Sequence, residues 1–445
     1  PTSRCSSAAS DVYKRQVDVD ADGGLWVTLT QPDPVAERPR LLASLRRGIE
    51  RDYVGQISRD IVRLLRADAN PGELIWEAVA HGAPRAEFGW GHSIASLTDC
   101  LAMVDDYVDD DRALPIVQAI AGVSEVARDR PVQPLPDPVE PGADARAAFR
   151  RFVEAEQLEP AQALVRGAIE TGATATDLRP WFTDVVSDHL LSYGHGAIYA
   201  QKAFQLLDRL GWDRADTVLP HLVPTIVYGT REDTLPYMKP FHRGVDQLDV
   251  AALSESVRSP DPQWQDDGRL LAALLGGDRT EAARAAGAAM MAGASLEAVL
   301  DVVTAAVSER LLRYDPAGEF DFHDDFGWLD ITHGLTYSNA VRWHLAQSHD
   351  AGEALTEDHV RLVLWTVFLA NWTGRHEWHV GVGERAEVEP RSPDLLDYGR
   401  SLQHEALLDG TTAFNVHAHP VKMSDAATEE ALLLDSPMPL DATSL

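Results

Sequence analysis

The sequence predicts an all-α protein, with repeated helical units packed around a central site and a short β-hairpin near the N-terminus. Three observations support this fold class. From about residue 46 onward Ala, Leu, Arg and Glu dominate, and apolar residues recur at intervals of three and four, as in residues 282–312. The breaks between these segments are rich in Pro or Gly. A segment headed by histidine recurs along the chain, which indicates a repeat.

The first residues come before this helical region. Residues 11–16 (DVYKRQ) resemble a translated sequencing adapter, so we expect residues 1–16 to be a tail outside the fold; a genuine basic tail is the alternative. Residues 17–30 alternate apolar and polar on both sides of DADGG, which predicts a hairpin within a lead-in at 17–45. We expect a single helical catalytic domain at residues 46–425 and a C-terminal tail at 426–445.

Composition restricts the classes of partner. The 445 residues are 45% hydrophobic and 24% charged, and 39 Lys+Arg against 70 Asp+Glu give a formal net charge of −31. So acidic a surface repels phosphate backbones and anionic lipids, and no apolar run approaches the roughly 20 residues of a membrane span. Two cysteines are too few for a disulfide framework or a Cys-based zinc ribbon. We expect a cytoplasmic protein with no nucleic-acid or membrane partner.

The repeat places four histidines in related positions. At an offset of 121 residues, Gly172-Ala173 aligns with Gly293-Ala294, and each copy then reaches a His-Gly pair: HGAIYAQKA and, after 17 inserted residues, HGLTYSNAV. A fainter copy ends in GWGHSIASL and a fourth in NVHAHPVKM. Each unit is predicted to be two helices followed by a third helix that begins at the histidine. In the fourth unit, Pro420 is suited to the first position of that third helix. The four histidines are His92, His195, His333 and His419.

Equivalent side chains on quasi-symmetric helices point to a common centre, so we predict that these four imidazoles converge. Imidazole is a common ligand of iron, copper, nickel and zinc, which makes the cluster a candidate metal centre. The alternative is that each His-Gly pair only caps and packs a helix. In the fourth segment His417 competes with His419 as the ligand.

Lysine is scarce in this chain, with only Lys14, Lys202, Lys239 and Lys422, whereas arginine is common, so a lysine is expected where a simple positive charge does not suffice. Lys422 lies three residues after His419 on the same helical face. A buried amine can lose its proton and act as a base or nucleophile, or add carbon dioxide and become an oxygen ligand. Lys202 lies seven residues after His195 on one face. An exposed or snorkelling lysine is the alternative in both cases.

Aromatic residues flank the histidines and predict an apolar pocket for a small hydrophobic substrate. Tyr199 and Tyr337 each follow a repeated histidine by four residues, and either can contact a ligand or a substrate oxygen; core packing is the alternative. The inserted residues 316–331 are expected to bring Phe320, Phe322 and Trp328 to the substrate entrance. The roles of His189, His376 and His379 stay open.

The segments HGAIYAQKA, ITHGLTYSNAV and HPVK resemble the questin oxidase-like family of all-helical, histidine-ligated non-haem iron oxygenases, over roughly residues 46–425. The resemblance implies Fe(II) held by His92, His195, His333, His419 and a carbamylated Lys422, with dioxygen and a polyketide-like aromatic as substrates. Another divalent transition metal is the alternative cofactor. A metal-dependent hydrolase and a non-catalytic helical-repeat scaffold are the alternative functions.

Overall fold

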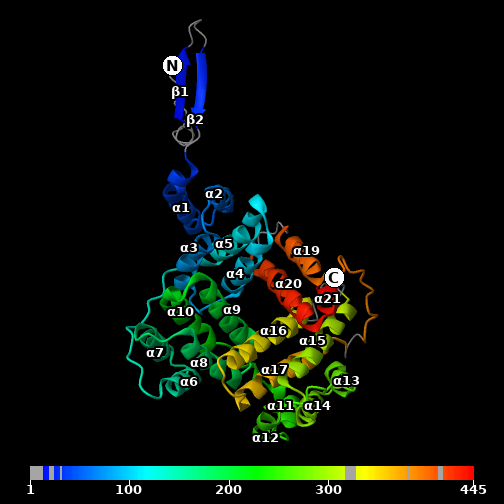
Figure 1. Cartoon of the computed structure of the whole chain (residues 1–445). Coiled ribbons are helices and arrows are strands. Elements are labelled where there is room, and N and C mark those ends of the chain that lie inside the picture. Colours follow the sequence, from blue (N-terminus) through cyan, green and yellow to red (C-terminus); the bar gives the residue numbers. More distant parts are fainter. Residues whose placement is uncertain are drawn as a thin grey trace.

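The computed structural model describes residues 14–19, 25–30, 33–315, 327–377, 381–408 and 414–444. Apart from one pair of strands, these residues form helices and their connections, which confirms the predicted all-α class (Figure 1). Among the described helices, none combines the length and the apolar character needed to cross a membrane.

The two strands are β1 (Lys14–Val19) and β2 (Leu25–Thr30), which pair antiparallel and stand apart from the helices in Figure 1. The turn of the predicted hairpin, residues 20–24, lies outside the described residues, so the hairpin stays a prediction. The predicted tail at residues 1–16 also stays one, because residues 1–13 lie outside them as well.

Most helices surround a central group that is described below. These outer helices are α1 (Pro34–Glu50), α2 (Val54–Arg66), α3 (Pro71–Gly82), α5 (Ala113–Ala127), α6 (Ala145–Glu154), α7 (Leu158–Glu170), α8 (Ala175–Asp188), α10 (Ala215–Val227), α11 (Lys239–Val245), α12 (Val250–Ser256), α13 (Arg269–Leu275), α14 (Arg279–Met291), α15 (Leu296–Arg313), α17 (Glu357–Trp372), α19 (Leu395–Leu408) and α21 (Met438–Thr443). Short 3₁₀ turns connect them at η1 (Ala83–Arg85), η2 (Val104–Asp106), η3 (Asp109–Arg112), η4 (Ser192–Gly194), η5 (Trp212–Arg214), η6 (Glu232–Thr234) and η7 (Pro236–Met238).

The helix bounds reproduce the sequence repeat. Helices α7 and α14 begin and end 121 residues apart, and α8 and α15 begin 121 residues apart. In these two copies, and in α2 followed by α3, the second helix starts 17 residues after the first. The turn between the paired helices holds a left-handed residue each time, with φ of 60° at Asp68, 95° at Gly172 and 102° at Gly293. Three copies therefore share one local conformation.

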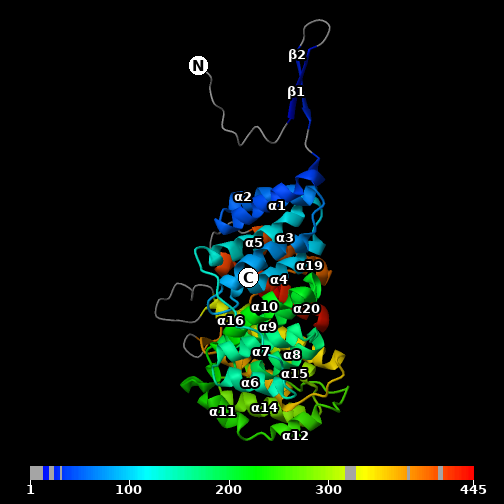
Figure 2. The same ribbon diagram turned by 90° about the vertical axis from the view of Figure 1, so that its left-hand side faces the viewer.

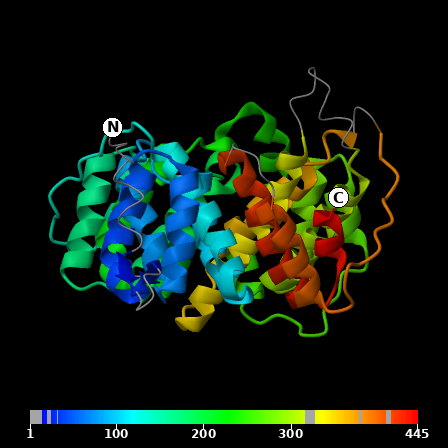
Figure 3. The ribbon, with the colours of Figure 1, turned by 90° about the horizontal axis from the view of Figure 1, so that it is seen from above.

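The histidine-bearing helices form the centre of the molecule. Helices α4 (His92–Met103), α9 (His195–Leu210), α16 (Trp328–Asp350) and α20 (Phe414–Leu434) close into a ring in which each packs against the next, and α20 packs back on α4. Figure 2 shows them at mid-height, between α1 and α2 above and α11 and α12 below. In Figure 3 the orange-red C-terminal helices lie beside the cyan N-terminal ones, in agreement with the packing of α20 on α4 and α5. The four histidine-bearing helices therefore pack against one another at the centre.

Two of the predicted helix starts are wrong. Helix α16 begins at Trp328, so His333 lies in its second turn; the Asp330 carboxylate caps this earlier start by accepting from the Gly327 backbone N at 3.0 Å. Helix α20 begins at Phe414, so Pro420 lies inside it. An internal proline removes one backbone hydrogen bond, and the fully buried Val421 and Met423 in the next turn offset that cost.

Residues 426–444 of the predicted tail are part of the helical fold, and residue 445 lies outside the described residues. Helix α20 continues to Leu434, and α21 follows it with Leu440 fully buried. Glu430 has no exposed surface, accepts from Arg342 at 3.0 and 3.1 Å and accepts from the Thr304 hydroxyl at 3.0 Å. A charged residue in a C-terminal segment is here a core residue, because its partners come from α15 and α16. Buried apolar residues from Leu41 to Ala442 form one continuous core.

Candidate metal centre

The four repeat-related histidines converge, as predicted. Ring centroids lie 4.6 Å apart for His92 and His195, 4.0 Å for His92 and His419, 4.8 Å for His195 and His333, and 5.8 Å for His333 and His419. Each ring belongs to a different helix of the central ring and is only partly buried. The cluster therefore keeps an accessible face.

Two imidazoles of the cluster have fixed tautomers. His195 Nδ1 faces the Ser192 carbonyl oxygen, and His333 Nδ1 lies 2.6 Å from the Leu329 carbonyl oxygen. A carbonyl oxygen only accepts hydrogen bonds, so each Nδ1 carries the proton and each neutral ring keeps its lone pair on Nε2. The two Nε2 atoms lie 3.0 Å apart. Two lone pairs therefore face each other at contact distance.

Protonation is a costly way to relieve this repulsion. Burial lowers the pKa of His195 well below its ordinary value, and neighbouring His333 and Lys422 lower it further. Burial, together with the charge of Lys422, lowers the pKa of His333 to about 4. Both rings are therefore neutral at pH 7. A metal cation beside both Nε2 atoms could accept the two lone pairs that face each other.

Lys422 and Tyr199 meet at the third imidazole. Lys422 Nζ lies 2.7 Å from His92 Nδ1, and the Tyr199 hydroxyl lies 3.2 Å from the same atom. Lys422 is only 4% exposed, and burial lowers its pKa to about 7 although the charge of Asp99 opposes the shift. The amine is therefore readily neutral, in contrast to an ordinary surface lysine. The alternative of an exposed Lys422 is wrong.

The residues fit a bound transition metal in part. Two nitrogen ligands about 2.1 Å from one metal and at right angles to each other lie about 3.0 Å apart, which is the separation of the His195 and His333 Nε2 atoms. Metal-bound histidines usually donate their other N–H to a carbonyl oxygen or carboxylate, as both of these do. Within the described part of the chain, however, no set of three or more His, Cys, Asp or Glu side chains has the arrangement of a ready metal site. The cluster is a pair of aligned ligands with two further imidazoles in ring contact.

Other predicted site residues are separated by the structure. His417 is buried and directs Nε2 to the Ala406 carbonyl oxygen, so it is His419 that joins the cluster. Tyr337 is buried with its ring against Gly194, and both burial and Asp233 raise its pKa. Tyr199, in contrast, contacts His92 directly.

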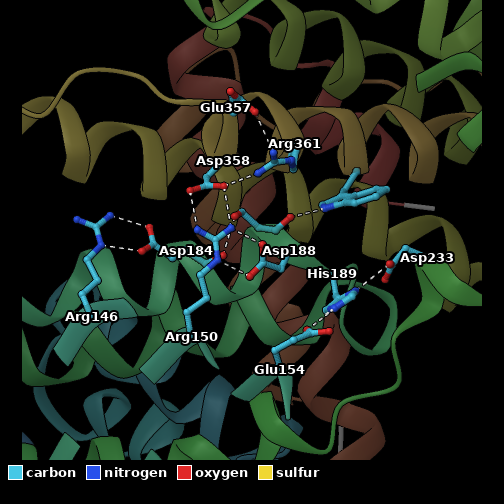
Figure 4. Close-up of polar contacts among 12 residues, drawn as sticks. Arg146, Arg150, Glu154, Asp184, Asp188, His189, Asp233, Glu357, Asp358 and Arg361 are labelled. Carbon is cyan, nitrogen blue, oxygen red and sulfur yellow. Dashed lines mark hydrogen bonds and ion pairs between the residues drawn. The ribbon is translucent and has the colours of Figure 1, made fainter. Parts of the chain in front are cut away.

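The predicted entrance is described only at one residue. Phe320, Phe322 and His379 lie outside the described residues. Trp328 lines a cavity of about 540 Å³ together with His417 and Pro420, which flank His419 in sequence. His376 is buried and contacts the Tyr314 ring. His189 belongs to a separate polar cluster, shown in Figure 4.

Sequence reasoning missed a second buried layer below the imidazoles. Lys202, only 4% exposed, places Nζ 2.5 Å from Asp99 and 3.5 Å from Asp425. Burial alone lowers the pKa of this lysine, but the surrounding carboxylates outweigh it and raise the pKa. The sequence held part of the signal, since Asp99 follows His92 by seven residues and Asp425 follows His419 by six, about two helical turns in each case; it did not say which helices are neighbours. Three helices of the ring are joined by one ion-paired cluster.

Comparisons with protein families, with curated protein sequences and with solved structures give no match to this chain. The questin oxidase-like resemblance therefore rests on the short segments quoted above.

Proposed function

We propose that this protein is a non-haem metal-dependent oxygenase that holds Fe(II) and acts on a hydrophobic, aromatic polyketide-like small molecule. The observation that carries the proposal is the pair of Nε2 atoms of His195 and His333, which face each other at 3.0 Å with both tautomers fixed by carbonyl oxygens. Such an arrangement is unfavourable for two neutral rings alone and favourable beside a cation.

The ligand set favours a transition metal. His195 and His333 supply aligned nitrogens, and His92 and His419 lie in ring contact with them. Imidazole nitrogen suits iron, copper, nickel and zinc, whereas magnesium and calcium prefer oxygen ligands. Bound Fe(II) supplies the redox chemistry with dioxygen that side chains lack.

The chain's own residues take complementary roles. Lys422, with a pKa lowered to about 7, can stay neutral beside a cation or add carbon dioxide at Nζ and become an anionic oxygen ligand. The Tyr199 hydroxyl, 3.2 Å from His92 Nδ1, can hold or pass a proton there. The cavity of about 540 Å³ beside Trp328 has the size of a small-molecule site, and we assign it to substrate access.

The choice of an oxygenase rests on the family resemblance. The segments that carry it contribute His195, His333, His419 and Lys422, which lie in one cluster. A hydrolase that activates a metal-bound water would use similar ligands but would not consume dioxygen. Dependence on dioxygen therefore separates the two classes of enzyme.

The first test is metal analysis of protein purified without a His tag, with His349→Gln as the control. His349 is a histidine whose side chain is 90% exposed. We expect one equivalent of iron per chain in the parent and in the control, and a loss of iron in His195→Gln and His333→Gln. Parent protein that binds no transition metal, even after anaerobic addition of Fe(II), would refute the metal centre.

The second test examines dioxygen chemistry. Nitric oxide added anaerobically to the Fe(II) protein should give the high-spin ferrous–nitrosyl EPR signal if a coordination position is open. Oxygen-electrode measurements with a panel of planar hydroxylated aromatic polyketides should then show substrate-dependent uptake. Metal binding with no nitrosyl signal and no oxygen uptake would favour the hydrolase instead.

A further inference from the structure

His195 enters α9 from a loop with an unusual backbone. Ser192, Tyr193 and Gly194 are consecutive and all left-handed, with φ of 46°, 61° and 99°. Non-glycine residues rarely adopt this conformation, so surrounding contacts must hold it. The loop has a direct consequence for the cluster, because the Ser192 carbonyl oxygen is the one that His195 Nδ1 faces. Whatever holds the loop also fixes the His195 tautomer.

The loop is attached to the segment at residues 230–233. The Ser192 backbone N donates to the Thr230 carbonyl oxygen at 2.7 Å, and the Thr230 N donates to the Ser192 hydroxyl oxygen at 2.9 Å. The Glu232 N donates to the Leu190 carbonyl oxygen at 3.1 Å. These bonds place the loop relative to η6.

His189 joins this attachment to a third element. Its Nδ1 lies 2.8 Å from Asp233 Oδ2 and its Nε2 lies 2.9 Å from Glu154 Oε2, as Figure 4 shows. The other oxygen of Asp233 accepts from the Leu190 backbone N at 3.1 Å. Carboxylates only accept when ionised, so the imidazole that satisfies both is the doubly protonated one. One side chain thus connects α6, the loop and η6.

The charges around His189 favour that form. The Asp233 hydrogen bond raises its pKa, partial burial opposes this, and Glu154 raises it further. Charged and titratable groups nearby include Arg231, which donates to the Glu154 backbone O at 2.7 Å, and Arg150, which pairs with Asp188 at the end of α8. Arg151 lines the same pocket as His189, and His242 Nε2 lies 2.7 Å from the Asp233 backbone O. Because the folded pKa is raised, the clamp is complete below the ordinary histidine pKa and is lost as pH rises through the folded value.

We infer that His189 is a positioning residue: through Asp233 it holds the left-handed loop so that the Ser192 carbonyl oxygen keeps the His195 proton on Nδ1 and its Nε2 toward His333. The consequence for metal binding rests on the proposed function. The consequence for the loop does not, because it concerns hydrogen bonds of the protein alone.

Three variants test the inference. His189→Leu removes both hydrogen bonds, and His189→Gln keeps an amide donor for one carboxylate. Arg146→Gln is the matched control, since Arg146 pairs with Asp184 at 2.6 Å on the same α6–α8 face and has no bond to the loop. Hydrogen exchange of the amides at residues 190–194 is measured at pH 6, followed by Zn(II) affinity and its pH profile.

We expect faster exchange at residues 190–194 in His189→Leu, partial recovery in His189→Gln and parental exchange there in Arg146→Gln. Zn(II) affinity should fall by about 10- to 100-fold in His189→Leu, the usual effect of losing a group that orients a metal ligand. Because only the parent loses the His189 clamp as pH rises, the ratio of parental to His189→Leu affinity should decrease toward alkaline pH.

Unchanged exchange at residues 190–194 in His189→Leu overturns the inference, whatever the metal result. Faster exchange with unchanged Zn(II) affinity also overturns it, because the loop would then not control His195. If the parent binds no metal, the proposed function fails, and the exchange measurement alone still decides whether His189 holds the loop.

Discussion

Replacing Lys202 by methionine should destabilise the fold strongly, because the change removes a buried cation and leaves its carboxylate behind. Lys202 and Asp99 are 4% and 1% exposed, and their charged atoms lie 2.5 Å apart. Methionine fills most of the lysine stem, so the loss is mainly electrostatic. Removing one partner of a buried ion pair costs about 3–5 kcal/mol, which is more than a hundredfold in the folded-to-unfolded ratio.

The assay is guanidinium denaturation of the parent, Lys202→Met, the double variant Lys202→Met/Asp99→Asn and the control Lys239→Met. Lys239 is exposed, so its replacement should change the free energy of unfolding by less than about 0.5 kcal/mol. Neutralising Asp99 in the double variant should recover a large part of the loss, because the carboxylate nearest to Lys202 is then no longer an uncompensated buried charge. Lys202→Met with the stability of Lys239→Met would refute the reasoning.

Four further outcomes follow from the cluster and its surroundings. His195→Gln should lower transition-metal affinity by more than about a hundredfold in calorimetric titration, and His349→Gln should not change it. Lys422→Arg keeps a positive charge and should lose metal and turnover, whereas Lys422→Ala should be partly rescued by added formate; full metal binding by Lys422→Arg would contradict a ligand role. Burial raises the pKa of Asp425, so parental stability should fall from pH 4 upward relative to Asp425→Asn; parallel pH–stability curves would contradict this. Gly194→Ala should cost about 1–3 kcal/mol in denaturation, because its φ is 99° and a Cβ would lie 2.6 Å from the Tyr337 ring.

The convergence of the histidines was predictable because it depends on a repeat. An offset of 121 residues in the sequence becomes the same offset between α7 and α14, and the histidine-bearing helices pack against one another in a ring. The helix starts were less predictable. His-Gly suggested that His333 begins a helix, but the Asp330 carboxylate caps α16 at Gly327. Asp330, the third residue of α16, is a local sequence signal for a helix start at Gly327, but the repeat alignment placed the start at His333 instead.

The partners of the charged core were not predictable by the same route. Asp99 lies on α4, Lys202 on α9 and Asp425 on α20, and the three side chains form ion pairs because these helices are neighbours. The sequence does not say which helices are neighbours in the ring. The same limit applies to His189 and Asp233, which are 44 residues apart and meet because the loop before α9 bonds to residues 230–233. Pairing of distant segments is decided by packing, and periodicity carries no information about it.

The two buried lysines show how the layers of the central ring differ in chemistry. Both are 4% exposed, and both face the ring interior from histidine-bearing helices. Lys202 keeps its proton because carboxylates of α4 and α20 surround it, and its pKa is raised. Lys422 meets His92, a neutral imidazole, and burial lowers its pKa to about 7. The charged layer thus secures the helices, and the neighbouring layer holds the Lys422 amine together with the imidazoles of His92, His195 and His333, whose pKa values burial lowers. A cation that enters this layer meets no ammonium charge when Lys422 is neutral, and a carbamate at Nζ would give it an anionic ligand without a buried aspartate or glutamate at the same place.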